Sequence, residues 1–411
     1  MKSKKILYIN QYFKHPSEPG ITRSYWIAQE LIKRGYEVVM LAHRNELLDH
    51  VKDVKPVEIT YVDGIKVIYI RNKYSNDMGV FKRAVSFINF MLKSTKYAVR
   101  EKDINLVIAT STPLTVAFPA LVRKIMKKTP YVFEVRDLWP EVPIQMGAIK
   151  NRFVIKFLSW CEKIIYKKSI HTVALSPGML DGVLKYIEKE RTSMIPNMAK
   201  IDKFWPREKN MELMEKMGLK KDSFKAIYFG QMGQSNDVEV IIEAAKKLKE
   251  QQVNDIEFVV VGHGSKYSKV ANAITEFKLD NIKIFPRVPM SEMSEIINFC
   301  DLSMVLFSNI PILYTNSPNK LFDSLSAAKP IIVNSAGWTK TMVEEAECGL
   351  FVKPNDAEDL IKAINLIKND SELKNKMAIN SRLLAEREYD KSILCNRFAD
   401  LTDNLFKKHN L

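Results

Sequence analysis

One short segment, NSPNKLFD at residues 316–323, combines residue types that suit a phosphate and a pair of sugar hydroxyls. We expect a helix to begin at Lys320, and a helix N-terminus presents free N–H groups and the positive end of its dipole to an anion. Asp323 follows in the first turn, where a carboxylate accepts hydrogen bonds from ribose hydroxyls, as the acidic residue of dinucleotide folds does. The pattern predicts a nucleotide site, although an ordinary N-cap followed by a first-turn acid fits the same residues.

Glycines follow two of the expected strands and let the backbone approach a ligand closely. Gly230 and Gly233 lie in the segment GQMG, where successive backbone amides would point towards a phosphate. Gly20 lies in the loop after the first expected strand, ahead of a helical segment. A plain structural connection explains each of these loops as well, so neither identifies a ligand by itself.

The segment RDLWPE at residues 136–141 follows another expected strand and places a cation beside two acids. Arg136, Asp137 and Glu141 would thus project from the carboxyl end of a strand, where ligands of α/β sheets bind. A local ion pair between Arg136 and Asp137 is the structural alternative.

The chain has 411 residues and a formal net charge of +15, from 63 Lys and Arg against 48 Asp and Glu. This length suits two domains, and the charge favours an anionic partner. Nucleic acid is not expected, because the sequence lacks zinc-finger spacing and the aromatic-basic strand of RNA-binding modules. The four cysteines have no metal or redox spacing and indicate a reducing compartment. No apolar run approaches the length of a membrane span, so we expect a cytoplasmic protein.

Short β-branched strands alternate with longer helical segments in both halves of the chain. We expect strands at residues 6–10, 38–42, 67–70, 106–110, 131–135 and 172–175, then at 226–230, 258–262, 282–285, 302–306 and 331–334. Near-continuous apolar strands separated by helices are typical of parallel sheets covered on both faces. The predicted fold is α/β, with two Rossmann-like, doubly wound parallel-sheet domains facing across a cleft. We expect the domains at 1–200 and 201–388, and a C-terminal helix at 389–411 that returns to the first domain.

Taken together, these segments resemble the family 4 retaining glycosyltransferases of GT-B fold. The resemblance covers essentially the whole chain, through GITRSYWIAQEL, RDLWPE, IPNMAKIDKF, FGQMG, FVVVGHG, PNKLFDSLSAAKP and ECGLFVKPND. Each motif is short, but their order and spacing together are specific. RDLWPE and SPNKLFD are similar to the bacterial branch that includes N-acetyl-L-fucosamine, colanic-acid and O-antigen transferases.

The resemblance implies a donor site in the second domain. The family's second paired glutamate, which holds the ribose, falls on Asp323, whereas the first falls on the non-acidic Thr315. An Arg and a Lys that usually follow the glycine turn are replaced by Gln231 and its polar neighbours. Lys320 is therefore our candidate for the missing charge, with Arg287 as the second choice. The donor-binding residues implied are Gly20, Gly230, Gln231, Gly233, Arg287, Ser317, Pro318, Asn319, Lys320, Leu321 and Asp323.

The resemblance also implies a reaction. A UDP-linked sugar, for example an N-acetylated amino sugar or a deoxy sugar, would be transferred with retention to a lipid-linked saccharide in bacterial O-antigen or capsule synthesis. Asp137 would orient the acceptor hydroxyl or take its proton, while Arg136 and Glu141 would bind the acceptor. Lys320 would stabilise the departing diphosphate, with no metal and no cofactor. The alternatives are a UDP-sugar epimerase of the same fold and a non-catalytic nucleotide-binding protein.

Two basic segments raise the question of membrane contact. Residues 80–100 fit a helix with one polar side and one apolar side. The polar side carries Lys82, Ser86, Asn89, Lys93, Lys96 and Arg100. The apolar side carries Val80, Ala84, Phe87, Met91 and Ala98, flanked by Ile88 and Leu92. Residues 152–168 similarly align Arg152, Lys156, Lys163 and Lys167. Such helices either cover a sheet with solvated lysines or rest on anionic lipid headgroups. Given the overall charge, we expect shallow attachment to the inner face of the bacterial cell membrane.

Overall fold

The computed structural model describes residues 4–18, 20–45, 56–74 and 78–411. The chain divides into two compact units of similar size. Unit 1 comprises Met1–Pro16, Gly20–Pro196 and Ser392–Leu411, and unit 2 comprises Ser17–Pro19 and Asn197–Lys391. The C-terminal segment therefore belongs with the first half of the chain.

Unit 1 contains an eight-stranded sheet in the order β3-β4-β2-β1-β5-β6-β7-β8. Its strands are β1 Lys5–Ile9, β2 Glu37–Asn45, β3 Val57–Val62, β4 Ile65–Asn72, β5 Ile104–Thr110, β6 Tyr131–Val135, β7 His171–Ala174 and β8 Thr192–Met194. All pair in parallel except β3, which runs antiparallel to β4. The sequence analysis did not predict β3, which adds one antiparallel edge strand to the expected parallel sheet. A two-residue turn at Asp63 and Gly64, both with positive φ, makes β3 and β4 a hairpin.

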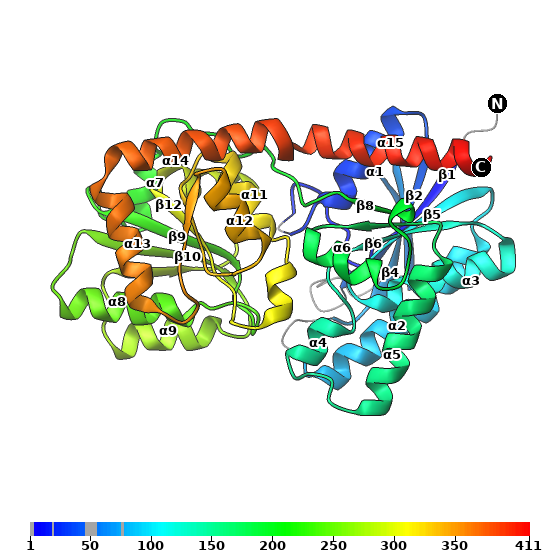
Figure 1. The fold of residues 1–411 in the computed structure, drawn as a ribbon, viewed down its shortest axis with the longest axis horizontal. Coiled ribbons are helices and arrows are strands. Elements are labelled where there is room, and N and C mark those ends of the chain that lie inside the picture. Colours follow the sequence, from blue (N-terminus) through cyan, green and yellow to red (C-terminus); the bar gives the residue numbers. More distant parts are fainter. Residues whose placement is uncertain (1–3, 19, 46–55, 75–77) are drawn as a thin grey trace. The chain divides into compact units, whose positions relative to one another are not determined.

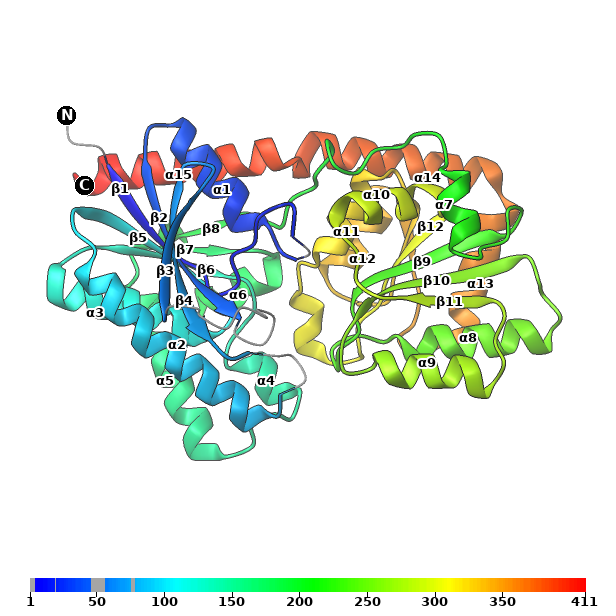
Figure 2. The ribbon, with the colours of Figure 1, turned by 180° about the vertical axis from the view of Figure 1, so that it is seen from behind.

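Helices cover both faces of this sheet. They are α1 Arg23–Lys33, α2 Val80–Arg100, α3 Ala117–Lys127, α4 Glu141–Gln145, α5 Arg152–Lys168, α6 Pro177–Leu184 and α15 Lys391–His409, with short 3-10 turns at Leu114–Val116 and Lys189–Arg191. Figures 1 and 2 show α2, α3 and α5 on one face, and α1 with α15 on the other. From Ser392 onward α15 is held by polar contacts: Asp403 accepts hydrogen bonds from Arg34 at 2.7 Å and from Tyr36 at 2.6 Å.

Unit 2 contains a six-stranded, fully parallel sheet in the order β11-β10-β9-β12-β13-β14. Its strands are β9 Phe224–Gln231, β10 Ile256–His263, β11 Ile282–Phe285, β12 Leu302–Val305, β13 Ile331–Val333 and β14 Gly349–Phe351. Its helices are α7 Met211–Lys216, α8 Glu239–Glu250, α9 Tyr267–Glu276, α10 Met290–Phe299, α11 Asn319–Ser326, α12 Trp338–Glu345, α13 Ala357–Asn369 and α14 Ser371–Leu384, with a 3-10 turn at Pro311–Thr315 and a π-helical turn at Ala385–Tyr389.

Both faces of the unit 2 sheet are apolar, which explains the near-continuous apolar strands in the sequence. Tyr228 and Phe258 belong to a core shared with α8, α9 and α13, whereas Phe229 and Val261 belong to a second core shared with α7 and α10. Figure 2 shows α8 and α9 on one side of this sheet and α10 and α11 on the other. The loops at the carboxyl ends of β9 and β12 lead directly to the predicted nucleotide residues.

Candidate active site

The loop ahead of α11 is pinned in place by the segment that follows β8. Asn197 donates a hydrogen bond from its side chain to the Ser317 carbonyl at 2.5 Å and from its backbone to the Ser317 hydroxyl at 3.3 Å. The helix begins at Asn319, one residue earlier than expected, with Pro318 as its N-cap. Leu321 is fully buried and anchors the first turn in the core. The backbone amides at this helix start are therefore fixed in position.

Lys320 extends a cation towards the glycine turn of β9. Its Nζ lies 3.8 Å from the centre of the Tyr228 ring, is buried, and has no hydrogen-bond partner among the described residues. Burial lowers the pKa of Lys320 to about 7. A buried ammonium without a carboxylate partner is costly, and the aromatic ring compensates only part of that cost. Among the described residues, the Lys320 amine beside this helix N-terminus thus has no hydrogen-bond or ionic partner.

The glycines of the β9 turn are needed for close contacts. Gly230 has φ of +109°, and a Cβ there would lie 3.4 Å from Cε and 3.6 Å from Nζ of Lys320. A Cβ on Gly262, the neighbouring residue on β10, would lie 1.8 Å from the Gly230 carbonyl oxygen. Gly233 donates its N–H to the side chain of Asn236 at 3.3 Å, and Gln231 is exposed. Gly230, unlike Gly233, borders Lys320 directly.

Asp323 forms an ion pair that the sequence analysis missed. Lys200, which is buried in the segment after β8, bonds the Oδ1 atom of Asp323 and also lies 5.7 Å from the centre of the Phe204 ring. Burial raises the pKa of Asp323, and the charge of Lys200 opposes that rise. A carboxylate accepts more than one hydrogen bond, so the pair still leaves acceptor capacity for a ligand.

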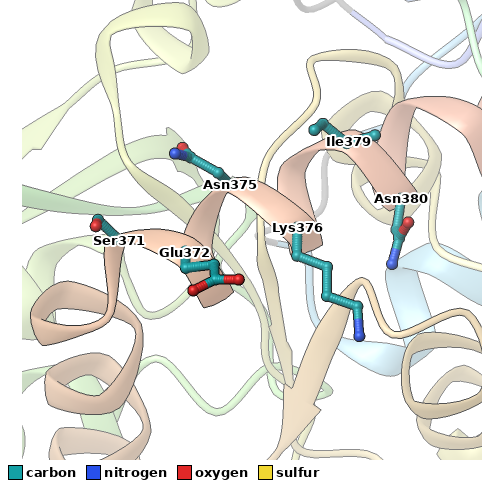
Figure 3. Close-up of a pocket in the computed structure, with 6 residues that line it drawn as sticks. All are labelled: Ser371, Glu372, Asn375, Lys376, Ile379 and Asn380. Carbon is teal, nitrogen blue, oxygen red and sulfur yellow. The ribbon is translucent and has the colours of Figure 1, made fainter.

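Of two residues discussed for the donor site, Arg287 lies apart from the β9 turn and Thr315 bonds within its own turn. Arg287 is exposed after the edge strand β11, and β10 separates β11 from β9. Thr315 lies in a 3-10 turn and its hydroxyl donates to the Ile312 carbonyl at 2.8 Å. A surface hollow on α14 includes none of the predicted site residues, since all six of its lining residues come from that helix (Figure 3): Ser371, Glu372, Asn375, Lys376, Ile379 and Asn380.

In unit 1, the end of β6 is organised by a buried ion pair. Glu134 accepts hydrogen bonds from Arg23 at 2.9 Å and from the Thr110 hydroxyl at 2.6 Å. Both charged side chains are almost completely buried. Burial alone would raise the pKa of Glu134, but the nearby Arg23 and Arg136 charges lower it overall. Arg23 also donates to the carbonyls of Ile195 and Pro196, which ties α1 to the chain after β8.

Arg136 and Asp137 follow directly from this anchored strand. The Arg136 backbone N–H donates to the Ser111 hydroxyl at 2.8 Å, and Asp137 accepts a hydrogen bond from the Thr112 hydroxyl at 3.2 Å. Burial raises the pKa of Asp137 to about 6, although the charge of Arg136 opposes the rise. Burial also lowers the pKa of Arg136. A carboxylate with a pKa near 6 suits a group that accepts a proton near neutral pH.

Glu141 and Gly20 both lie at exposed positions. Glu141 is exposed at the start of α4 and accepts a hydrogen bond from Gln145 of the same helix at 2.6 Å. Gly20 is exposed just before α1, with φ of +147°, and a Cβ there would lie 3.1 Å from Cγ of Lys14. Asp137 bonds to Thr112, whereas Glu141 bonds within its own helix.

The orientation of α2 differs from the expected one. Ser86, placed on the outward polar side by the sequence analysis, is buried together with Phe90, Ser94 and Ala98. It donates to the Lys73 carbonyl at 2.7 Å and accepts a hydrogen bond from Asn72 at 2.9 Å. Buried hydrogen bonds therefore turn a partly polar side inward. The outward side carries an apolar stripe, with these exposed members: Phe81 (80% exposed), Val85, Ile88 and Leu92 (62% exposed).

A second outward apolar group lies on the first half of α5. Phe153 is 86% exposed, and the rings of Phe157 and Trp160, both exposed, stack with centroids 6.1 Å apart. Lys156 and Lys163 are exposed on the same helix. None of the helices in the described parts of the chain combines the length and hydropathy needed to cross a bilayer.

Comparison with known proteins identifies the fold and the family of this chain. Sucrose-phosphate synthase from Thermosynechococcus elongatus superposes with a TM-score of 0.78 at 15% identity, covering 98% of this chain and all of that one. A glycosyl transferase 4-like domain model matches residues 20–198, and a glycosyl transferases group 1 model matches residues 209–384. The chain is a group 1 glycosyltransferase of GT-B fold.

One further solved structure shares the fold, and one curated protein is similar in sequence. HepE from Anabaena, solved in complex with UDP-glucose, superposes with a TM-score of 0.72 at 15% identity, covering 98% of this glycosyltransferase and all of that chain. An Escherichia coli UDP-Gal:α-D-GlcNAc-diphosphoundecaprenol α-1,3-galactosyltransferase is 27% identical over 240 residues. That match spans 57% of this chain and 60% of the relative.

The buried pair in unit 1 leads to a stability prediction. Arg23→Leu leaves the Glu134 carboxylate without its main partner, and we expect a loss of about 3–5 kcal/mol in the unfolding free energy. Lys33→Met removes an exposed ion pair with Glu30 and should change the unfolding free energy by less than about 0.5 kcal/mol. Urea unfolding of the three proteins tests this, and equal midpoints for wild type and Arg23→Leu would contradict it.

Proposed function

We propose that this glycosyltransferase transfers a sugar from a UDP-linked donor to a lipid-linked saccharide acceptor, with retention of configuration and without a metal. The observation that carries the proposal is the unpaired, buried ammonium of Lys320 beside the fixed start of α11. A buried cation without a partner is stabilised when an anionic ligand reaches it. A diphosphate is such an anion, and a helix N-terminus adds backbone donors to it.

In this proposal Lys320 and the amides of Ser317, Asn319 and Lys320 stabilise the departing diphosphate. The bond between the anomeric carbon and the diphosphate oxygen breaks, and negative charge builds on that oxygen. A fixed cation in a site of low dielectric stabilises this charge without reorganising. In this proposal Lys320 supplies the charge that the family resemblance assigns to an Arg and a Lys after the glycine turn, where this chain has Gln231.

Asp323 would hold the ribose of the donor. Lys200 occupies one carboxylate oxygen of Asp323 and fixes the side chain, so that its remaining lone pairs face a ligand in a defined geometry. Hydrogen bonds from two ribose hydroxyls fit this acceptor, as in dinucleotide folds. Lys320 and Asp323 are three residues apart on α11, less than one turn, so a diphosphate at the first would have its adjoining ribose near the second.

Asp137, in the first domain (unit 1), would act on the acceptor. The acceptor oxygen bonds to the anomeric carbon while its proton passes to Asp137 or to the departing diphosphate. Arg136, next along the loop, would hold an acceptor phosphate. The E. coli relative, whose name gives a diphosphoundecaprenol-linked acceptor, supports a lipid diphosphate of this kind.

We further propose that this first domain rests on an anionic membrane surface on the cytoplasmic side. The outward stripe of α2 and the exposed rings of α5 offer apolar groups for shallow insertion, and both helices carry lysines beside them. Apolar side chains insert at the headgroup boundary, while each nearby cation adds about 1 kcal/mol with acidic lipids. Such attachment would bring the Asp137 loop to a lipid-linked substrate.

Charge removal in the proposed site should reduce the rate. Lys320→Ala and Asp137→Ala should each lower the turnover for sugar transfer by about a hundredfold or more, because each removes a group that acts in the transition state. UDP release from a nucleotide-sugar donor in the presence of acceptor measures it. Lys246→Ala removes a different lysine that lies over an aromatic ring and serves as control. Unchanged turnover in both site variants would overturn the assignment.

The pKa values predict a narrow pH optimum. Asp137 is active when ionised, so kcat/KM should fall as the pH drops below about 6. Lys320 is active when protonated, so kcat/KM should fall as the pH rises above about 7. Lys320→Arg should extend activity to higher pH, since arginine stays protonated. An alkaline limb that is the same in wild type and Lys320→Arg would remove Lys320 from this role.

The α2 stripe should determine membrane affinity. Phe81→Ser combined with Leu92→Ser should weaken binding to phosphatidylglycerol vesicles by about tenfold or more, because two apolar side chains no longer insert. Ile379→Ser, a change of an exposed apolar residue on α14, should have no effect. Vesicle co-sedimentation at low salt measures the affinities. Absence of wild-type binding, or equal binding of all three proteins, would contradict the proposal.

A further inference from the structure

A row of aromatic rings runs through unit 1 and ends at the Asp137 loop. The first three rings, Tyr12, His43 and Tyr74, are mutual neighbours with centroids 5.2–6.0 Å apart. Tyr74 stacks on Phe87 at 5.9 Å, and Phe87 meets Trp139 edge-on at 6.3 Å. Trp139 lies two residues after Asp137. The row therefore reaches the loop proposed to activate the acceptor.

The strand order places this ring row along one edge of the sheet. His43 lies on β2 near its carboxyl end, and Tyr12, Tyr74 and Trp139 follow β1, β4 and β6. These strands are parallel members of one sheet, so their carboxyl ends lie at the same edge. All five rings are half-buried, whereas the large aromatic residues of the core are almost fully buried. Rings with accessible surface at a strand edge are typical of a ligand site.

Polar groups with unused hydrogen-bonding capacity accompany the ring row. Nδ1 of His43 lies 3.3 Å from the Gln11 carbonyl, and a carbonyl only accepts, so this nitrogen carries the proton. Nε2 is left as a neutral acceptor, and it has no partner among the described residues. The side chain of Gln11 is fully buried, and its amide nitrogen and oxygen likewise lack partners there. Buried polar groups that lack a protein partner are usually hydrogen-bonded to a ligand or to water.

A surface hollow borders the same part of unit 1. It is lined by residues adjoining Tyr74 and Phe87 in the sequence, namely Lys73 and Ser86, and by Phe81 and Lys82 of α2. Cations and exposed apolar groups thus meet next to the ring row. This combination suits the phosphate and the first part of the lipid chain in an acceptor whose sugar lies on the rings.

We propose that the ring row is a saccharide subsite, which binds the sugar ring of the acceptor and presents one of its hydroxyls to Asp137. The proposal rests on the proposed function, since it names where the acceptor of that reaction binds. A pyranose ring has an apolar C–H face that packs on aromatic rings, and hydroxyls at its rim that require hydrogen-bond partners. The half-buried rings provide the aromatic packing surface. Nε2 of His43 and the Gln11 amide provide the hydrogen-bond partners.

The subsite is tested by saturation-transfer NMR with methyl α-glycosides of N-acetylglucosamine, N-acetylgalactosamine, glucose and galactose at millimolar concentration. We expect wild type to saturate the C–H protons of one sugar face for at least one of the four probes. Tyr74→Leu combined with Phe87→Leu keeps apolar packing but removes two rings, and should weaken binding by about tenfold. Tyr61→Leu, which changes an exposed ring on β3, should bind as wild type does.

His43→Phe provides a second variant that keeps a ring but removes the Nε2 acceptor. It should weaken binding about tenfold while the pattern of saturated C–H protons stays the same, a combination that a purely structural role for His43 would not produce. Thermal shift with UDP, measured on every variant, reports the donor site separately. Failure of UDP to bind would count against the donor proposal alone. No saccharide signal in wild type, or equal affinity in wild type and both ring-row variants, would overturn the subsite.

Discussion

The buried ion pair between Arg23 and Glu134 is the constraint on which unit 1 depends. Glu134 is the penultimate residue of β6, and Arg23 begins α1, so the pair joins a central strand to a helix far from it in sequence. The same guanidinium holds the carbonyls of Ile195 and Pro196. Two buried charges are stable only together, so the ion pair fixes the end of β6. The Arg136–Asp137 loop follows directly and is therefore fixed as well. Unit 2 repeats this arrangement with Lys200 and Asp323.

Most of the fold follows from the sequence because parallel strands buried on both faces are nearly all apolar. The eleven expected strands overlap strands of the structure, and the GT-B architecture is confirmed. The misses have local causes. The strand β3 alternates between more and less exposed residues at a sheet edge, and the Asp63–Gly64 turn was its only strong signal. The strands β8 and β14 have three residues each, too few for a pattern.

The site was partly predictable, since glycines, a helix start and strand-end acids are visible in sequence order. Lys320 and Gly230 do meet, as two loops of one sheet edge should. Lys200 could not be found this way, because its pairing with Asp323 spans 123 residues and no local pattern encodes it. Glu134, a charged residue inside an apolar strand, was a signal that the sequence analysis passed over. The facing of α2 was predicted only in part: Ala98 is buried as expected, but Ser86 turns inward because it and Asn72 hydrogen-bond to one another inside the protein.

The unpaired ammonium of Lys320 has a thermodynamic consequence for ligand capture. Near neutral pH this lysine is only partly protonated, because burial holds its pKa at about 7. An arriving diphosphate would favour the charged form, so nucleotide binding would draw a proton from solution. The measured heat would then vary with the ionisation enthalpy of the buffer, and mild acidification would tighten capture of the nucleotide.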